Sequence, residues 1–486
     1  MKLNKIFIYG ILLAAASLTA CEDEVMIGKA NNPNLSVPGE VVYVTDPDGK
    51  RLFTHIDLRD TKDIPLYVNT PKALKRDCNI AFVYDETVLA EYNAANGTSY
   101  EAVPKSMVSL TNDGITRLEA GNTISQPMTV TVTSDGSLDN DKGYAIPLRA
   151  SVNNGETALT KNSSSRLIFV RDLTGLPDAT KTVLKDGVEV PAVRTMMCME
   201  VNDMNPLEVT SYTLKNSGKM YYDAVMLFAA NINYNEETGR VYVNCNENVS
   251  AILANRDHYL QPLQDRGIKV YLSILGNHDR ANVNNLADET ARYYAQEIKN
   301  YCDVYKLDGV FYNSEYGSPI SPAPEGFVNP SYTAAARLFY EVKKLQPHRD
   351  NIIYTYDFSS LPSVDGVQPG EYMDFIWTNY GGGPIDPADF PGVPKFNLGH
   401  YSWEFTQGST YGNLSQLRND GYGLHVHFGN RMRQSAMQNS ARAFYDDDLV
   451  YDGKTGSNLK NSLYHETKIL YYQFGTCYFM RLSCLM

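Results

Sequence analysis

Two different hydrophobic patterns follow one another along the chain. From residue 37 to residue 172, short runs alternate apolar and polar positions and are separated by turn sequences such as Asp-Pro-Asp-Gly at 46–49. Alternation with a period of two is typical of strands that bury one face. Two clear examples are Pro127–Thr133 and Tyr144–Val152. Many short strands separated by turns predict an all-β sandwich domain over residues 37–172.

The pattern changes after a polar stretch at residues 173–188, which predicts a linker or a strand pair. From residue 189 to residue 465, strand-like apolar runs alternate with helical patterns, which is the order of elements in an α/β fold. Eight runs are strand candidates: Thr195–Val201, Ala224–Ala230, Lys269–Leu275, Val304–Phe311, Ile352–Tyr356, Phe375–Trp377, Phe396–Leu398 and Leu424–Phe428. Eight such strands predict a (β/α)8 TIM barrel.

Two helices of this part are defined by apolar spacing. One stripe consists of Ala291, Tyr294, Ala295, Ile298, Tyr301 and Cys302. The other consists of Ala335, Leu338, Phe339, Val342 and Leu345, and Pro347 ends it. Each stripe lies on one face of a helix, so we expect both helices to cover the outside of the barrel.

The first twenty residues have the layout of an export signal. Two lysines precede an apolar run from Ile6 to Leu18, which is too short to cross a bilayer as a helix. The run ends in Leu-Thr-Ala-Cys at 18–21, which resembles a bacterial lipoprotein box. This resemblance implies that residues 1–20 are removed and that Cys21 carries a lipid anchor; a signal cleaved elsewhere is the alternative. The acidic start of the tether at 21–36 resembles the export tag of Bacteroides surface lipoproteins, which implies the outer surface of the outer membrane.

Composition narrows the possible partners. The chain has 486 residues, and its 43 basic and 56 acidic side chains give a net charge of −13, which disfavours nucleic acid. It has 35 Tyr, which suit packing and sugar stacking equally. Besides Cys21, six cysteines have no C-x-x-C spacing and no close His partner, so they suggest neither a zinc site nor a redox pair.

The apolar tail at 466–486 has no clean periodicity and stays unassigned.

The chemistry is concentrated in the fourth strand candidate and the residues that follow it. Because side chains alternate along a strand, Phe311, Asn313 and Glu315 are expected to share a face. They come at the carboxyl end of the strand, where barrel enzymes place their reacting groups. Glu315 is the strongest candidate acid, since desolvation in an aromatic pocket would raise its pKa and keep it protonated. The alternative is a structural carboxylate paired with an Arg or Lys of the barrel.

This run resembles the active-site strand D-G-x-D-x-D-x-E of glycoside hydrolase family 18, whose members include chitinases and endo-β-N-acetylglucosaminidases. Asp308, Gly309 and Glu315 match, whereas Phe311 and Asn313 replace the second and third Asp. The resemblance implies that the substrate's own N-acetyl oxygen is the nucleophile, with Glu315 as acid/base and residue 313 holding the acetamide. Asn313 can accept the acetamide N–H but brings no charge. This loss could lower the rate on the order of hundreds-fold.

Other segments extend the resemblance. The run Lys269–His278 is similar to the family's third strand, with Ser273 and Gly276 beneath the catalytic strand. The run Glu200–Leu207 is similar to the end of the first strand of endoglycosidase members. The run Trp377–Gly382 is similar to the sixth strand, whose Tyr donates to the acetamide oxygen and whose preceding amide contacts the sugar.

The resemblance therefore implies a site of two kinds of residue. The catalytic group is Glu315, Asn313 and Tyr380. The substrate-binding group is Asp308, Asn379, Trp377, Glu200, Asn202 and Asn277. No metal or organic cofactor is implied.

Two functions fit this site. The first is a surface endo-β-N-acetylglucosaminidase that cleaves the GlcNAc-β1,4-GlcNAc core of N-glycans with retention. The second is a weakly active or inactive lipoprotein on the same barrel, which binds N-glycans for an import system. The absence of acid at Asn313 and Ser314 suits the second function, although the unrelated family 85 endoglycosidases resemble this site in using Asn two residues before the acid.

Three further features have competing interpretations. Gly-Asn-His-Asp at 276–279 matches a motif of two-metal phosphatases, but the D-x-H and G-D-x-x-D motifs that should precede it are missing. His425 and His427 are spaced like metal ligands of amidohydrolases, yet packed or sugar-contacting histidines are favoured without an acidic ligand set. Trp403 and Tyr401 are candidate stacking platforms or packing residues.

Overall fold

The computed structural model describes residues 40–153, 157–380, 382–410 and 412–453. The export signal, Cys21, the tether at 21–36 and the tail at 466–486 lie outside these residues, so the interpretations given for them remain predictions. Within the described ranges, no helix combines the length and apolar character needed to cross a bilayer.

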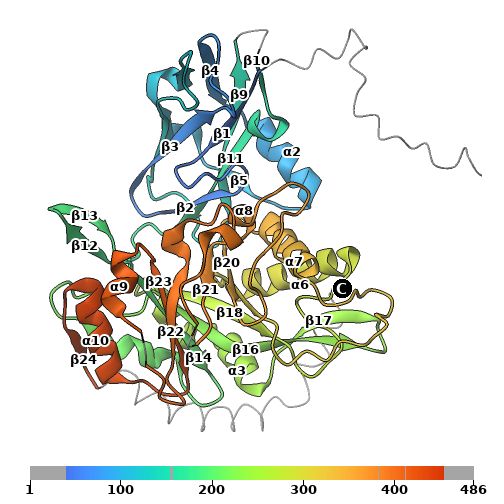
Figure 1. The fold of residues 1–486 in the computed structure, drawn as a ribbon, viewed down its shortest axis with the longest axis vertical. Helices are drawn as coiled ribbons and strands as arrows, with labels where there is room; N and C mark the ends of the chain where they lie inside the picture. The colour runs from blue at the N-terminus through green and yellow to red at the C-terminus, as the bar shows by residue number, and fades with distance from the viewer. Residues whose placement is uncertain (1–39, 154–156, 381, 411, 454–486) are drawn as a thin grey trace, which may run out of the picture.

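Two mostly antiparallel sheets form the N-terminal part of the molecule (Figure 1). The first has the order β10 (Thr157–Leu159), β1 (Glu40–Thr45), β3 (Thr61–Asn69), β8 (Met128–Thr133) and β6 (Val108–Leu110). The second has the order β2 (Thr54–Leu58), β11 (Ser165–Asp172), β9 (Tyr144–Val152), β4 (Cys78–Tyr84) and β7 (Ile115–Leu118), with β5 (Glu101–Ala102) beside β9 and α2 (Glu86–Asn96) packed against β9. Met128, Val130 and Val132 are buried in the core of this part, as their alternation predicts.

Eight parallel strands form the barrel predicted for the second part. Their order around the barrel is β14 (Arg194–Glu200), β16 (Ala224–Asn235), β18 (Lys269–Leu275), β19 (Gly309–Asn313), β20 (Asp350–Tyr354), β21 (Phe375–Trp377), β22 (Gly399–Glu404) and β23 (Leu424–Gly429), which returns to β14. A single parallel bridge between Ile376 and Leu398 joins β21 to the start of β22, so the barrel is nearly closed. The (β/α)8 prediction is confirmed.

Smaller elements complete this part. A hairpin of β12 (Thr182–Lys185) and β13 (Val188–Pro191) precedes the barrel. β17 (Arg240–Asn244) pairs antiparallel with the end of β16, and β15 (Tyr212–Leu214) pairs with β24 (Leu449–Tyr451). The helices are α3 (Glu247–Ala254), α4 (Arg256–Tyr259), α5 (Gln261–Gln264), α6 (Asp288–Val304), α7 (Tyr332–Leu345), α8 (Pro369–Tyr372), α9 (Leu414–Asn419) and α10 (Gln434–Tyr445).

Alternation along the strands divides the core into two layers. On β14, Met196 and Cys198 point into the barrel, whereas Met197 and Met199 join the core between strands and helices. Strands buried on both faces are typical of parallel sheets covered by helices. The predicted stripes of α6 and α7 pack in the outer layer, and Ser331 begins α7 by accepting a hydrogen bond from the Ala334 amide at 3.1 Å.

Two of the predicted strand positions are wrong. Helix α6 continues to Val304, whose side chain is exposed, and the fourth strand begins only at Gly309. Residues 395–397 form a short 3-10 turn after Pro394, so the seventh strand begins at Gly399 rather than at Phe396. In both cases, a short apolar run beside the strand was mistaken for the strand itself, because apolar runs of this length do not distinguish helix or turn from strand.

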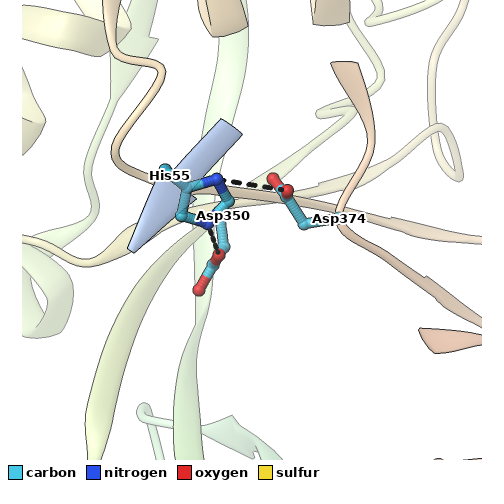
Figure 2. A group of neighbouring side chains, drawn as sticks. All are labelled: His55, Asp350 and Asp374. Atoms are coloured by element: carbon cyan, nitrogen blue, oxygen red, sulfur yellow. Dashed lines mark hydrogen bonds and ion pairs between the residues drawn. The ribbon is translucent and has the colours of Figure 1, made fainter. Parts of the chain in front are cut away.

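The N-terminal sheets lie against the amino ends of the barrel strands (Figure 1), where ion pairs join the two parts. His55 of β2 lies between Asp350, the first residue of β20, and Asp374, just before β21 (Figure 2). The distances from the imidazole nitrogens are 3.3 Å to Asp350 and 3.9 Å to Asp374. The carboxyl ends of the strands, where the candidate catalytic residues follow, are therefore at the opposite end of the barrel.

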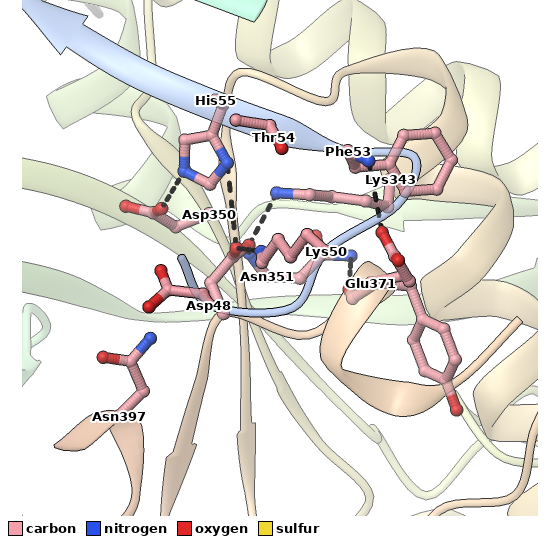
Figure 3. A network of polar contacts seen from close by, with 12 residues as sticks. Asp48, Lys50, Phe53, Thr54, His55, Lys343, Asp350, Asn351, Glu371 and Asn397 are labelled. Atoms are coloured by element: carbon pink, nitrogen blue, oxygen red, sulfur yellow. Dashed lines mark hydrogen bonds and ion pairs between the residues drawn. The ribbon is translucent and has the colours of Figure 1, made fainter. Parts of the chain in front are cut away.

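Lysines neutralise the carboxylates at this interface (Figure 3). Lys50, in the loop before β2, lies 2.9 Å from Asp374, and Lys343 of α7 lies 2.7 Å from the same carboxylate. Burial alone would raise the pKa of Asp374, but the two ammonium groups outweigh it and hold this pKa well below its usual range. Lys269 lies 2.9 Å from Asp350. The two parts of the chain are thus joined by buried, charge-balanced contacts.

Candidate active site

Asn313 and Glu315 form a hydrogen-bonded pair at the carboxyl end of β19. The Asn313 Nδ2 donates to Glu315 Oε2 at 2.8 Å, and the Glu315 amide donates to Asn313 Oδ1 at 2.9 Å. Asn313 is the last residue of the strand and is buried, whereas Glu315 lies in the turn that follows and is half-buried. The amide at the end of the strand and the carboxyl in the turn are therefore held together by two hydrogen bonds, although Glu315 itself lies beyond the strand on which it was expected.

The environment of Glu315 favours its protonated form. Burial raises the pKa of this carboxyl, the hydrogen bond from Asn313 opposes the rise, and the nearby Asp357 adds to it. The net effect is a pKa above the ordinary Glu value. Among the described residues, no ion pair involves Glu315, so the alternative of a structural carboxylate paired with Arg or Lys finds no support. A half-buried carboxylic acid of this kind can donate a proton to a leaving oxygen.

The segment that carries Glu315 rests directly on the third strand. A Cβ added to Gly276 would lie 2.4 Å from the Glu315 carbonyl oxygen and 2.6 Å from the Gly317 amide nitrogen, so no larger residue fits without moving this turn. Ser273 pairs in register with Phe311 of β19. Gly276 therefore packs against the turn that carries Glu315, whereas Ser273 lies beside the catalytic strand rather than beneath it.

Three predicted site residues come from the sixth strand and the loop that follows it. Trp377 is buried in the barrel interior, where its ring contacts those of Phe311 and Tyr354. The Asn379 Oδ1 accepts a hydrogen bond from the Tyr354 hydroxyl at 2.5 Å. Burial raises the pKa of the Tyr380 hydroxyl well above its ordinary value, so this group stays a hydrogen-bond donor. Tyr380 is close enough to Glu315 for the two to affect each other electrostatically.

Glu200 also belongs to the mouth of the barrel. It follows Met196 and Cys198 on the inward face of β14, and burial together with the nearby Glu200 and Glu315 raises the pKa of the Cys198 thiol. Burial, aided by Asp203, raises the pKa of Glu200 itself to about 7. The structure thus places Glu200 and Glu315 both near Cys198 at the mouth of the barrel, and the substrate-binding role of Glu200 remains a prediction.

Asn202 and Asn277 lie further out. Both side chains are exposed on loops at the carboxyl ends of the first and third strands. The Asn202 Oδ1 accepts hydrogen bonds from Asn246 and Asn248, both at 3.0 Å, and the Asn277 Nδ2 donates to Asn233 at 3.0 Å. They remain predicted substrate contacts at the rim.

Asp308 is not part of this site, which corrects the prediction. It precedes β19 at the amino end of the barrel, where Arg171 of β11 forms an ion pair with it. Its other carboxylate oxygen accepts hydrogen bonds from the Val270 amide at 2.7 Å and from Gln264 at 3.0 Å. The residues of the motif lie along one strand, so its first and last members belong to opposite ends of the barrel.

Sequence reasoning missed two carboxylates near the site. Asp357 follows β20 and accepts a hydrogen bond from the Ser314 hydroxyl at 2.6 Å. Glu404 ends β22, is buried, and lies near Tyr380; its Oε1 has no hydrogen-bond partner among the described residues. The signal for Glu404 was its place at the end of the seventh strand. Because that strand was predicted at Phe396–Leu398, Glu404 lay outside it, and the alternation of side chains could not be used to place Glu404 on the inner face.

The histidines of β23 face away from the site. His425 and His427 alternate with the inward Leu424 and Val426, so they point into the layer of helices. Burial lowers the pKa of His425 to about 3. The ring of Trp403 stacks on His427 in the same layer, with centroids 5.3 Å apart.

These contacts support packed histidines and a packing role for Trp403. Tyr401, half-buried on β22, packs against the same outer core.

A different group has the composition of a metal site. The donor atoms of His55, Asp350 and Asp374 lie within 4.8 Å of one another (Figure 2). Lys50 and Lys343 already bind Asp374, however, and a cation beside them would be repelled (Figure 3). We therefore assign this group to the interface between the two parts of the chain.

The barrel and its site together define a class. A half-buried carboxyl with a raised pKa, paired with an amide and near a tyrosine donor at the carboxyl end of an eight-stranded barrel, is the arrangement of a glycoside hydrolase.

Comparisons with known proteins show to which family of glycoside hydrolases this chain belongs. Endo-beta-N-acetylglucosaminidase F1 of Elizabethkingia meningoseptica is 44% identical over 288 residues, which are 57% of this chain and 85% of that protein. An endo-beta-N-acetylglucosaminidase of Flavobacterium sp. (strain SK1022) is 33% identical over 258 residues, 52% of this chain and 77% of that protein. The chain therefore belongs to the endo-β-N-acetylglucosaminidase family, and the resemblance read from its sequence is confirmed.

A solved structure and a domain model cover the N-terminal part as well. EndoBT-3987 of Bacteroides thetaiotamicron, crystallised with its Man5GlcNAc product, is 30% identical with a TM-score of 0.75 and covers 84% of this chain and 96% of its own. The same protein with a Man9GlcNAc2Asn substrate is 28% identical with a TM-score of 0.68, covering 84% and 95%. A family model described as an N-terminal domain matches residues 36–157.

Proposed function

We propose that this protein hydrolyses the GlcNAc-β1,4-GlcNAc core of N-glycans by a retaining, substrate-assisted mechanism. The observation that carries this proposal is the hydrogen-bonded pair of Asn313 and Glu315 at the carboxyl end of β19. The relatives named endo-beta-N-acetylglucosaminidase and the Man9GlcNAc2Asn substrate bound by EndoBT-3987 support the substrate class.

In the first step, the acetamide oxygen of the substrate attacks the anomeric carbon. Glu315 gives its proton to the leaving oxygen, and the bond between the two GlcNAc units breaks. Asn313 accepts the acetamide N–H, and Tyr380 donates to the acetamide oxygen before it attacks. In the second step, the Glu315 carboxylate takes a proton from water, which attacks the same carbon and opens the oxazolinium ring with net retention.

A second candidate function rests on the same residues. Asn313 brings no negative charge to balance the oxazolinium, and Ser314 directs its hydroxyl to Asp357. These features favour a barrel that binds N-glycans with little or no turnover and passes them to an import system. In both functions, lipid attachment at Cys21 would hold the protein on the outer membrane, facing outward.

One assay separates the two functions. The purified chain is incubated with high-mannose and complex N-glycoproteins, and released glycan is measured by mass spectrometry. Release that is lost in Glu315→Gln supports hydrolysis. Glycan binding without release supports capture, and neither release nor binding would contradict both.

A further inference from the structure

Two tyrosines next to the candidate acid expose their rings to solvent. Tyr316 is 56% exposed and follows Glu315 directly, whereas Tyr356 is 53% exposed and follows β20, the neighbouring strand. Single exposed aromatics are common on proteins. Two of them on adjacent loops at the carboxyl end of one barrel form a more specific feature, because this is the end at which the substrate must enter.

The two loops are fixed to each other and to the barrel. Ser314 lies two residues before Tyr316 and Asp357 directly follows Tyr356, and the 2.6 Å hydrogen bond between these two side chains links the loops. The Tyr316 carbonyl accepts a hydrogen bond from the His278 amide at 2.6 Å. The Tyr356 ring stacks on that of Tyr354, with centroids 6.0 Å apart and planes 18° apart.

The backbone of Tyr316 supports the same conclusion. Its φ of 62° lies in the left-handed region, which is unfavourable for a residue with a large side chain. Such conformations persist where surrounding contacts impose them, and they are concentrated at functional sites. Here Gly276 lies directly beneath the turn and the His278 amide holds its carbonyl. The rings have contacts of their own, Tyr316 with His278 at 5.6 Å and Tyr356 with Tyr354 at 6.0 Å. Rings that are already packed on a fixed backbone lose little freedom when a ligand binds.

The position of the rings indicates which sugar they meet. The Tyr354 ring contacts that of Tyr380 at 5.7 Å and that of Tyr356 at 6.0 Å, so the three rings lead from the acetamide-binding group to the exposed loops. In the proposed function, Tyr380 holds the sugar whose anomeric carbon reacts, and Glu315 protonates the oxygen of the next sugar. Tyr316 follows Glu315 directly, and Tyr356 precedes Asp357, which binds the Ser314 hydroxyl and is near enough to Glu315 to raise its pKa. Both tyrosines therefore belong to the loops around the acid, on the side where we place this next sugar.

We propose that Tyr316 and Tyr356 form an aromatic platform for the leaving group, the GlcNAc linked to asparagine. This inference rests on the proposed function, since it assigns the leaving-group side of the same site. A flat ring stacks on the apolar face of a pyranose, and its hydroxyl can bind the sugar or the peptide. Neither ring takes part in proton transfer, so both are positioning residues.

The test compares two substrates in Tyr316→Ala, Tyr356→Ala and the double variant. Man9GlcNAc2Asn carries the leaving GlcNAc, whereas the oxazoline of Man9GlcNAc lacks it. We expect kcat/KM for Man9GlcNAc2Asn to fall about three- to tenfold in each single variant. Hydrolysis of the oxazoline should be unchanged. Tyr→Phe variants, which keep the ring face, should retain most of the activity.

A matched control is Tyr451→Ala, which removes a tyrosine that is 45% exposed on β24. Binding of GlcNAc-asparagine, measured by NMR titration, tests the platform independently of turnover and should weaken in the alanine variants of the platform but not in Tyr451→Ala. Equal losses with both substrates, or unchanged cleavage and unchanged GlcNAc-asparagine binding in the double variant, would overturn the platform. The proposed hydrolysis fails separately, through absence of release by the wild type.

Discussion

At the scale of single residues, the site differs from the family pattern in its charge. The resemblance places an Asp where this chain has Asn313, and the structure shows that the amide occupies the position beside Glu315. An amide keeps the hydrogen bond of a carboxylate but not its charge. Electrostatic stabilisation of a developing positive charge is a large part of catalysis in such sites. An amide in place of a carboxylate at position 313 should therefore lower the rate of hydrolysis.

The first prediction concerns this missing charge. Asn313→Asp should raise kcat for Man9GlcNAc2Asn on the order of a hundredfold, because a carboxylate would balance the oxazolinium. The measurement is single-turnover cleavage by the wild type and the variant. Asn313→Ala serves as the control, since it removes both the hydrogen bond and the amide and should be slower than the wild type. A slower Asp variant would show that the amide itself is required.

The second prediction concerns Asp357. Its negative charge helps to raise the pKa of Glu315, so removing the charge should lower that pKa. Glu315 would then lose its proton at lower pH, and the alkaline limb of the profile of kcat/KM against pH should move to lower pH in Asp357→Asn. The amide oxygen of Asn can still accept the Ser314 hydrogen bond. The surface variant Asp257→Asn should leave the limb in place; a limb that stays or moves upward in Asp357→Asn would refute the argument.

At the scale of elements, strand geometry decides which residues meet. Phe311 points into the barrel and Asn313 follows it on the same face, as alternation predicts. Glu315 lies in the turn beyond the strand, and its two hydrogen bonds with Asn313 bring the amide and the acid together. The same geometry explains the error with Asp308, because a motif that runs the length of a strand begins and ends at opposite ends of the barrel. Glu404 was missed because the apolar run that begins at Phe396 was taken for the seventh strand, whereas the strand begins at Gly399 and ends at Glu404.

The third prediction tests how closely two of these elements pack. Gly276→Ala would place a Cβ 2.4 Å from the Glu315 carbonyl oxygen, so the turn must shift. Displacing a catalytic group by about 1 Å can reduce the rate about a hundredfold, and we expect a fall in kcat of about ten- to a hundredfold with the fold preserved. Gly383→Ala is the matched control, since its Cβ would meet no atom within 4 Å. Equal effects of both variants on kcat would contradict this packing.

At the scale of the whole molecule, the N-terminal sheets support the barrel from the end opposite the site. Asp350 and Asp374 meet side chains of the N-terminal part, as does Asp308 through Arg171. Such contacts join residues far apart in the chain and follow no local period, so the sequence predicted both folds but not their interface. The exposed loops of the opposite end are thereby left free for substrate.

The fourth prediction separates stability from activity. Arg171→Ala would leave Asp308 buried without its counter-ion, and the free energy of unfolding should fall by about 3–5 kcal/mol. Chemical denaturation measures this loss, while kcat/KM should stay largely unchanged because the site lies at the other end of the barrel. Arg117→Ala is the control, because its ion pair with Asp77 is exposed to solvent and should contribute little to stability. A loss of activity without a loss of stability would contradict the structural role of Arg171.

The most direct test of the account follows the anomeric form of the released glycan. Man9GlcNAc2Asn is incubated with the wild type and with Glu315→Gln, and the first product is observed by NMR before it equilibrates. The account predicts that the wild type releases the β anomer first and that Glu315→Gln releases essentially none. Initial release of the α anomer, or equal release by both proteins, would contradict the assignment of Glu315 as the acid of a substrate-assisted hydrolase.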